Sequence, residues 1–280
     1  MATSWLRLMR AGALFSPAAD VVAGMALAGT PWSLAAVRTV FASVCVYAAG
    51  MILNDFADRR EDAVARPERP LPRGEISPGH AAAAGFGLLA LGVAISCAPA
   101  WHLGLAGLVL IYDFAAKRWP PSALVAMGSL RGLNLLAGAW FATHALPMPT
   151  LAAGLAYAIA IAAVTGLGIR EDGGQAPPLV VSAWIGLAVG SATVGVAWAG
   201  AWFTPAALIV PSFAVAFVRL PRGPGPVPSP RIRQEMLKLL LGCLVYAAAL
   251  CAAAQRWPEA AAILVCAPVA RWIARSIALT

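Results

Sequence analysis

The chain has 280 residues, of which 61% are hydrophobic and only 11% are charged. Soluble globular domains usually have about 25% charged residues, so this composition argues strongly against a water-soluble enzyme. The net charge of +8 does not point to nucleic acid, because the basic residues fall in short segments between long apolar runs, as in membrane proteins. We therefore expect an integral membrane protein that contacts the lipid bilayer and does not bind nucleic acid.

Apolar runs follow one another along the chain, and most have about 20 residues, enough for a helix to cross a bilayer core of roughly 30 Å. A last run, 258–279, carries Pro268, Arg271 and Arg275 and is either a tenth crossing or a half-helix at the interface. None of the runs shows the alternation of polar and apolar residues that barrel strands have, so the expected fold class is all-α, a polytopic transmembrane bundle. We expect a single domain over residues 1–280. The other runs lie near 11–29, 34–53, 78–97, 101–116, 121–142, 150–169, 177–199, 203–219 and 235–255.

Lysine and arginine are distributed unevenly between the two sets of loops. With the N-terminus in the cytoplasm, 15 of the 20 basic residues lie in cytoplasmic segments, and only Arg38 and Arg256 lie in the opposite loops. Since short cytoplasmic loops of membrane proteins are enriched in lysine and arginine, this bias predicts that the N-terminus and the candidate site loops are cytoplasmic. The expected location is a bacterial inner membrane.

Carboxylates are concentrated at the end of the second apolar run. Four of the 12 acidic residues lie in the stretch NDFADRRED, residues 54–62. If the helix continues past the membrane surface, Asn54, Asp58 and Asp62 stack on one face, with Asp55 one step round. A divalent cation would relieve the repulsion between stacked carboxylates, and oxygen ligands with room for substrate phosphates suit Mg²⁺. The alternative is a solvated helix end that is neutralised by its two neighbouring arginines.

The next segment, ARPERPLPRGEISPGH, sets three arginines among prolines. Prolines stiffen a loop, and the planar guanidinium fork of Arg66, Arg69 and Arg73 is suited to phosphate recognition. The alternative is a positive-inside anchor, which would explain the arginines but not the carboxylates. Ser77 followed by Pro78 predicts the start of the next helix. An acidic helix end followed by an arginine loop is what a magnesium–diphosphate site needs.

Three stretches resemble one known family. NDFADRREDAVARPERPLPRGEIS is similar to the first aspartate-rich motif of the UbiA-type intramembrane prenyltransferases, NDxxDxxxD, with its RPxRPLPxG continuation. YDFAAKR, residues 112–118, resembles the tyrosine-to-lysine stretch at the end of the family's fourth helix, and LRGLNLLAG, residues 130–138, resembles its fifth helix. The order and spacing agree over roughly residues 5–220. Within the superfamily the sequence is most similar to the EboC-like branch.

The resemblance implies a ring of about nine transmembrane helices around a central cavity. It also implies Mg²⁺-dependent transfer of a prenyl group from a polyprenyl diphosphate to an acceptor, which the sequence does not identify. The residues that it assigns are Asn54 and Asp58 as metal ligands, Asp55 and Asp62 in their support, Arg66 and Lys117 on the departing diphosphate, and Tyr112 beside the forming allylic cation.

The second acidic motif of the family departs from its pattern in this chain. The usual pattern has two aspartates one helical turn apart, whereas GIREDGGQ has only the adjacent pair Glu171 and Asp172, preceded by Arg170. Adjacent helical residues point about 100° apart, so we expect Glu171 to face the cavity as a metal ligand. The glycine pair frees Asp172 for catalysis. The departure from the pattern leaves three alternatives open. The protein holds one metal ion firmly and the other through the substrate, or it has an altered donor or acceptor specificity. The third alternative is a non-catalytic lipid-binding or transport protein.

Three charged residues lie within or near apolar runs, where a charge must face the bundle interior or an interface. We expect a structural pairing for Asp20 and a local ion pair between Asp113 and Lys117. Arg131 either pairs with Asp20 or reaches the diphosphate. Six helical glycines are expected to let helices pack closely, with a lateral groove for a prenyl chain as the alternative. They are Gly85, Gly87, Gly104, Gly107, Gly132 and Gly138.

Overall fold

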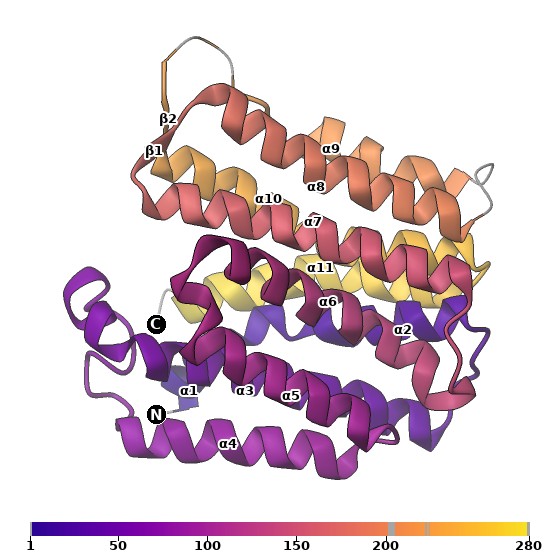
Figure 1. Ribbon diagram of the computed structural model, residues 1–280, viewed down its shortest axis with the longest axis horizontal. Coiled ribbons are helices and arrows are strands. Elements are labelled where there is room, and N and C mark those ends of the chain that lie inside the picture. Colours follow the sequence, from indigo (N-terminus) through magenta and orange to yellow (C-terminus); the bar gives the residue numbers. More distant parts are fainter. Residues whose placement is uncertain (1, 201–204, 222, 224, 279–280) are drawn as a thin grey trace.

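The computed structural model describes residues 2–200, 205–221, 223 and 225–278, and they form a helical bundle (Figure 1). Two short strands, β1 (Gln175–Ala176) and β2 (Val227–Pro228), pair antiparallel at one end. The α-helices are α1 (Ala2–Leu8), α2 (Phe15–Leu27), α3 (Leu34–Ala65), α4 (Pro78–Ile95), α5 (Pro99–Phe114), α6 (Pro120–Thr143), α7 (Met148–Asp172), α8 (Pro178–Ala199), α9 (Ile209–Phe217), α10 (Ser229–Ala253) and α11 (Trp257–Ala278).

Seven of these helices are long and apolar enough to cross a membrane, and two shorter apolar stretches accompany them. The predicted all-helical membrane bundle is therefore confirmed. The predicted count of about nine helices is not confirmed, because the described residues form eleven. The short α1 precedes the first apolar run, and the last run forms one helix, α11, that contains Pro268.

The helix starts follow local sequence rules. Seven helices, α4 to α8, α10 and α11, have proline at one of their first two positions, where its fixed φ and missing N–H are tolerated. The Ser33 side chain caps α3. The predicted cap of α4 is confirmed, because the Ser77 hydroxyl accepts a hydrogen bond from the His80 backbone N–H at 3.2 Å.

Helices α2 and α6 approach each other through glycines. A Cβ atom on Gly138 would lie 2.0 Å from the Val21 carbonyl oxygen, and one on Gly24 would lie 2.0 Å from the Leu135 carbonyl oxygen. This contact brings Asp20 of α2 opposite Arg131 of α6.

The six glycines predicted to promote packing divide into two groups. Gly85, Gly132 and Gly138 meet neighbouring helices closely, as predicted, whereas Gly87, Gly104 and Gly107 have nothing within 4 Å of an added Cβ. Gly87 lines an open apolar groove between α1, α3 and α4, together with Trp5, Met9, Ile52, Ala84, Leu88 and Leu91.

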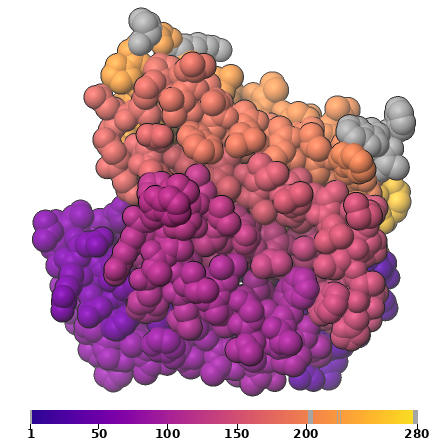
Figure 2. Space-filling model, in the orientation of Figure 1, coloured from indigo at the N-terminus to yellow at the C-terminus, as the bar shows by residue number. Residues whose placement is uncertain are grey.

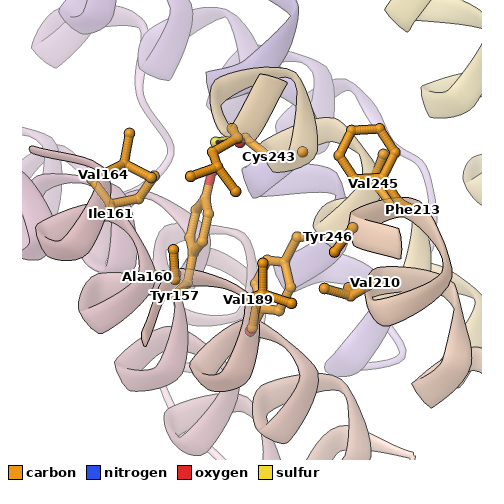
Figure 3. A pocket seen from close by; sticks show the side chains of 15 residues that line it. Tyr157, Ala160, Ile161, Val164, Val189, Val210, Phe213, Cys243, Val245 and Tyr246 are labelled. Atoms are coloured by element: carbon orange, nitrogen blue, oxygen red, sulfur yellow. Dashed lines mark hydrogen bonds between the residues drawn. The ribbon is translucent and has the colours of Figure 1, made fainter. Parts of the chain in front are cut away.

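The interior of the second half holds an apolar cavity between α7, α8, α9 and α10. Figure 3 shows Tyr157 and Tyr246 among its lining residues, and their rings stack with centroids 4.9 Å apart. The cavity measures about 40 Å³, room for little more than one water molecule. It therefore has no space for a diphosphate, and the candidate chemistry lies elsewhere.

Several segments far apart in the sequence meet at one end of the bundle. Figure 1 places the α3–α4 loop, the β1–β2 pair and both chain ends there, and Figure 2 shows the violet and magenta helices packed against the red and orange ones. We call this end the motif end. The 32 residues of α3 span about 48 Å at 1.5 Å per residue, well beyond a hydrocarbon core of roughly 30 Å. The overrun carries NDFADRRED, so the polar motif lies outside the apolar part of its helix.

Substitution of Gly138 tests the α2–α6 contact. We expect Gly138→Ala to lower the free energy of unfolding by about 1–3 kcal/mol, because its Cβ displaces a backbone carbonyl. Gly107→Ala is the matched control: its Cβ meets open space, and alanine should stabilise the helix by about 0.5–1 kcal/mol. Thermal unfolding in detergent measures both, and equal melting temperatures would contradict the packing role.

Candidate active site

Helix α3 continues to Ala65, as the first motif required, and presents Asn54 and Asp58 to one cation. The Lys117 ammonium donates to Asn54 Oδ1 at 2.9 Å and lies 2.5 Å from Asp58 Oδ1. Lys117 follows α5 in a short 3₁₀ turn (Ala116–Arg118), so the contact joins α3 to the end of α5. The predicted ion pair between Lys117 and Asp113 is replaced by this contact with Asp58.

Asp55 and Asp62 form a second pair around another cation. Both are buried, with 5% and 2% of their surface exposed. The Arg69 guanidinium donates from one nitrogen to Asp55 Oδ1 at 3.1 Å and to Asp62 Oδ2 at 2.6 Å. Arg10 adds a contact with Asp55 at 3.4 Å. The predicted single stack of carboxylates is thus two pairs, one held by a lysine and the other by arginines.

The arginine loop is fixed by apolar and charged anchors. Leu71 and Ile76 are buried against Leu8 and Ile52. Glu75 binds Arg7 at 3.4 Å and Arg73 at 3.1 Å. A hydrogen bond from Ser4, together with these two arginines, lowers the pKa of the Glu75 carboxyl. The loop is therefore folded back onto α1 and α3, and Arg69 points to carboxylates in place of solvent.

Arg66 connects the first acidic motif to the second. Its guanidinium lies 3.6 Å from Asp62 and 3.1 Å from Asp172. Glu171 lies 3.6 Å from Arg233 of α10. The Glu171 side chain is 19% exposed and that of Asp172 is 68% exposed, which agrees with the expectation that Glu171 is the one turned inward. Helix α7 ends at Asp172, as the glycine pair predicts.

Tyr112 lies in the last turn of α5, close to the acidic residues of α3. Its hydroxyl interacts electrostatically with Asp113, Asp58 and Arg10. The adjacent Phe114 ring packs edge-on against Phe56 with centroids 6.5 Å apart, which fixes the end of α5 beside the first motif. The structure therefore brings Tyr112 to the predicted metal ligands.

Arg131 takes the first of its two predicted alternatives and pairs with Asp20, at 3.0 Å. It also donates to Ser16 and to the Tyr157 hydroxyl, and Asn134 donates to Asp20 at 3.1 Å. These partners are protein groups in the bundle interior, so binding of Arg131 to a diphosphate stays a prediction. The pairing of Asp20 is structural, as expected.

Within the described residues, no group of three or more histidine, cysteine, aspartate or glutamate side chains is arranged to hold a metal ion. The reason is that lysine and arginine side chains stand among the carboxylates. The donor set nevertheless fits Mg²⁺, because the Asn54 and Asp58 oxygens already converge on one cationic atom, Lys117 Nζ. The sequence interpretation did not include Arg10 among the site residues. Its position in the basic N-terminal segment was the signal that could have identified it.

The comparisons with known proteins identify the family. The model of the UbiA prenyltransferase family matches residues 18–224. A digeranylgeranylglyceryl phosphate synthase of Methanopyrus kandleri is 32% identical over 141 residues, which are 49% of this chain and 52% of the relative. One of Methanospirillum hungatei is 31% identical over 209 residues, 65% of this chain and 73% of the relative. The chain belongs to the UbiA prenyltransferase family, as the three motifs predicted, and it spans about half the length of the Methanopyrus relative.

A solved structure supports the fold. A UbiA homolog from Archaeoglobus fulgidus bound to GPP and Mg²⁺ superposes with a TM-score of 0.55 at 17% identity, covering 99% of this chain and 100% of the other. At this identity the likeness is one of fold. It agrees with an integral membrane protein built as a helical bundle.

Removal of Arg69 tests whether it holds the acidic end of α3 together. We expect Arg69→Gln to lower the free energy of unfolding by about 3 kcal/mol, because two buried carboxylates lose their shared partner. Adding Asp62→Asn should restore part of the loss. Arg73→Gln is the control, since Arg73 is 54% exposed and a surface ion pair contributes less than about 1 kcal/mol. Equal losses for Arg69→Gln and Arg73→Gln in thermal unfolding would contradict this role.

Proposed function

We propose that this protein transfers a prenyl group from a polyprenyl diphosphate to an acceptor, with Mg²⁺, at the cytoplasmic side of the membrane. Membership of the UbiA prenyltransferase family supports the reaction class. The clustering of lysines and arginines in the segments that meet at the motif end supports the cytoplasmic orientation.

One observation carries the proposal: a single cationic atom, Lys117 Nζ, contacts the oxygens of both Asn54 and Asp58. Two oxygen ligands preset around a cation are what a magnesium site requires. The bound metal would act as a Lewis acid that stabilises negative charge on the leaving diphosphate. Lys117 then serves as the cation that holds these ligands in register in the metal-free protein.

The basic residues of the site bind the diphosphate. Lys117 is released from Asn54 and Asp58 to contact it, and Arg66, with 44% of its side chain exposed, turns from its carboxylates to the phosphate oxygens. Both side chains are anchored beside the ligands, so they neutralise charge on the leaving group where it develops. The Tyr112 ring lies at the same end of the bundle, in the last turn of α5. There the face of an aromatic ring would stabilise an allylic cation.

We expect the second acidic motif to bind metal less firmly than the first. We assign Glu171, the less exposed of the pair, to the metal side of the site, and Asp172 to removal of the acceptor's proton, with Asp55 and Asp62 in support. Both acids of the second motif are paired with arginines. We therefore infer one firmly held metal ion and a second held through the substrate.

The acceptor is proposed from the relatives. Their name, digeranylgeranylglyceryl phosphate synthase, makes a glyceryl phosphate lipid the first acceptor to assay. The arginines at the motif end suit such an anionic headgroup.

The second candidate function is a non-catalytic lipid-binding or transport protein. The observation that favours it is the pairing of both acids of the second motif with arginines. A protein of this kind should tolerate loss of the first-motif carboxylate at Asp58, which an enzyme should not.

Binding of a radiolabelled prenyl diphosphate to the purified protein tests the proposed function without knowledge of the acceptor. We expect binding that needs Mg²⁺ and that falls by at least about tenfold in Asp58→Asn, because one of the two preset ligands loses its charge. Glu61→Gln removes an exposed carboxylate of the same segment and should bind as the unaltered protein does. Absence of binding by folded protein across several chain lengths would favour the non-catalytic alternative.

A further inference from the structure

Asp113 is a buried carboxylate for which the sequence interpretation assigned only a local ion pair. It lies in the last turn of α5, directly after Tyr112, and only 3% of its surface is exposed. Its Oδ2 atom is enclosed and has no hydrogen-bond partner among the described residues. No ion pair of Asp113 with Lys117 forms there either, since Lys117 is taken up by Asn54 and Asp58.

The Asp113 carboxylate is electrostatically coupled to the acidic residues of α3. It interacts electrostatically with Lys117, Asp58, Arg10 and Asp55, so groups from α3, from the end of α5 and from the N-terminal segment surround it. It therefore belongs to the same charged site as the predicted metal ligands.

Asp113 differs from its neighbours because no lysine or arginine among the described residues forms an ion pair with it. Asp58 has Lys117, Asp62 has Arg69 and Arg66, and Asp55 has Arg69 and Arg10. A buried carboxylate without a partner is strongly unfavourable, and such groups in native proteins call for an explanation, such as a catalytic role or an ion. Asp113 lies one helical turn before Lys117, which contacts Asp58, and this placement points to an ion.

We propose that Asp113 is a carboxylate ligand of the divalent cation, which it binds together with Asp58. This inference rests on the proposed function. Asp113 would add a carboxylate that has no ion-pair partner among the described residues, whereas both acids of the second motif are paired with arginines. The metal–diphosphate site is then built from the ends of α3 and α5, with the second motif at its edge.

The ligand role predicts an inverse relation between stability and metal binding. A residue that only supports the fold destabilises the protein when it is replaced. Asp113→Asn instead removes an uncompensated buried charge while keeping the shape of the side chain, so the metal-free melting temperature should stay unchanged or rise. The rise in melting temperature that a fixed concentration of Mg²⁺ gives the unaltered protein should shrink in this variant, because stabilisation by a ligand depends on the ratio of its concentration to its Kd.

The experiment titrates purified protein in detergent with Mn²⁺, alone and with inorganic diphosphate, and follows bound Mn²⁺ by electron paramagnetic resonance. We expect Asp113→Asn to weaken Mn²⁺ binding by at least about tenfold, as loss of a metal-site carboxylate does. Asp113→Glu, which keeps the charge, should bind more tightly than Asp113→Asn. Glu61→Gln, an exposed acid of the same region, should leave Mn²⁺ binding unchanged.

Asp58→Asn separates the two proposals. If Asp58→Asn weakens Mn²⁺ binding and Asp113→Asn does not, the role of Asp113 is refuted and the proposed function stands. If neither variant changes binding, the proposed metal site itself is refuted. A lower metal-free melting temperature in Asp113→Asn, with Mn²⁺ affinity retained, would make Asp113 a structural residue.

Discussion

Mutual repulsion of the carboxylates at the end of α3 is the constraint that organises the motif end of the bundle. Asp55, Asp58 and Asp62 lie within two turns of one helix, and like charges at this spacing destabilise a helix by themselves. Cations from separate segments relieve the repulsion: the N-terminal segment, the arginine loop and the turn after α5 each supply one or more. These ion pairs join segments that apolar contacts also hold together, Leu71 and Ile76 against Leu8 and Ile52, and Phe114 against Phe56.

The bilayer imposes the complementary constraint on the interior. Many charged residues lie on the overrun of α3 and at neighbouring helix ends, because a charge in the hydrocarbon region is costly. The ion pair of Asp20 and Arg131 lies in the bundle interior and is accompanied by hydrogen bonds from Tyr157 and Asn134. This network links α2, α6 and α7.

The sequence predicted what periodicity and local rules determine. Apolar runs gave the membrane helices, Ser77 and Pro78 gave the start of α4, and the glycine pair gave the end of α7. Division of Asn54, Asp55, Asp58 and Asp62 into two pairs was not predictable, because helical spacing says which residues share a face but not which cations arrive from elsewhere. The same holds for Arg10 and Asp113, whose charged neighbours come from other segments of the chain. Conversely, Lys117 was expected to contact Asp113, four residues away, and a non-local partner, Asp58, replaced it.

The pairing of Asp55, Asp58 and Asp62 with lysine or arginine is compatible with substrate binding, because an exchange of partners conserves charge-assisted contacts. On the proposed function, Asn54 and Asp58 would hold a divalent cation once Lys117 is released, and the released basic side chains would bind the diphosphate. Guanidinium and ammonium groups bind carboxylate and phosphate with comparable strength, so little electrostatic energy is lost when both arrive together. Either one alone would leave unpaired charge in a partly buried site. Metal and diphosphate binding should therefore be strongly coupled, and the ion pairs of the metal-free protein are what makes them so.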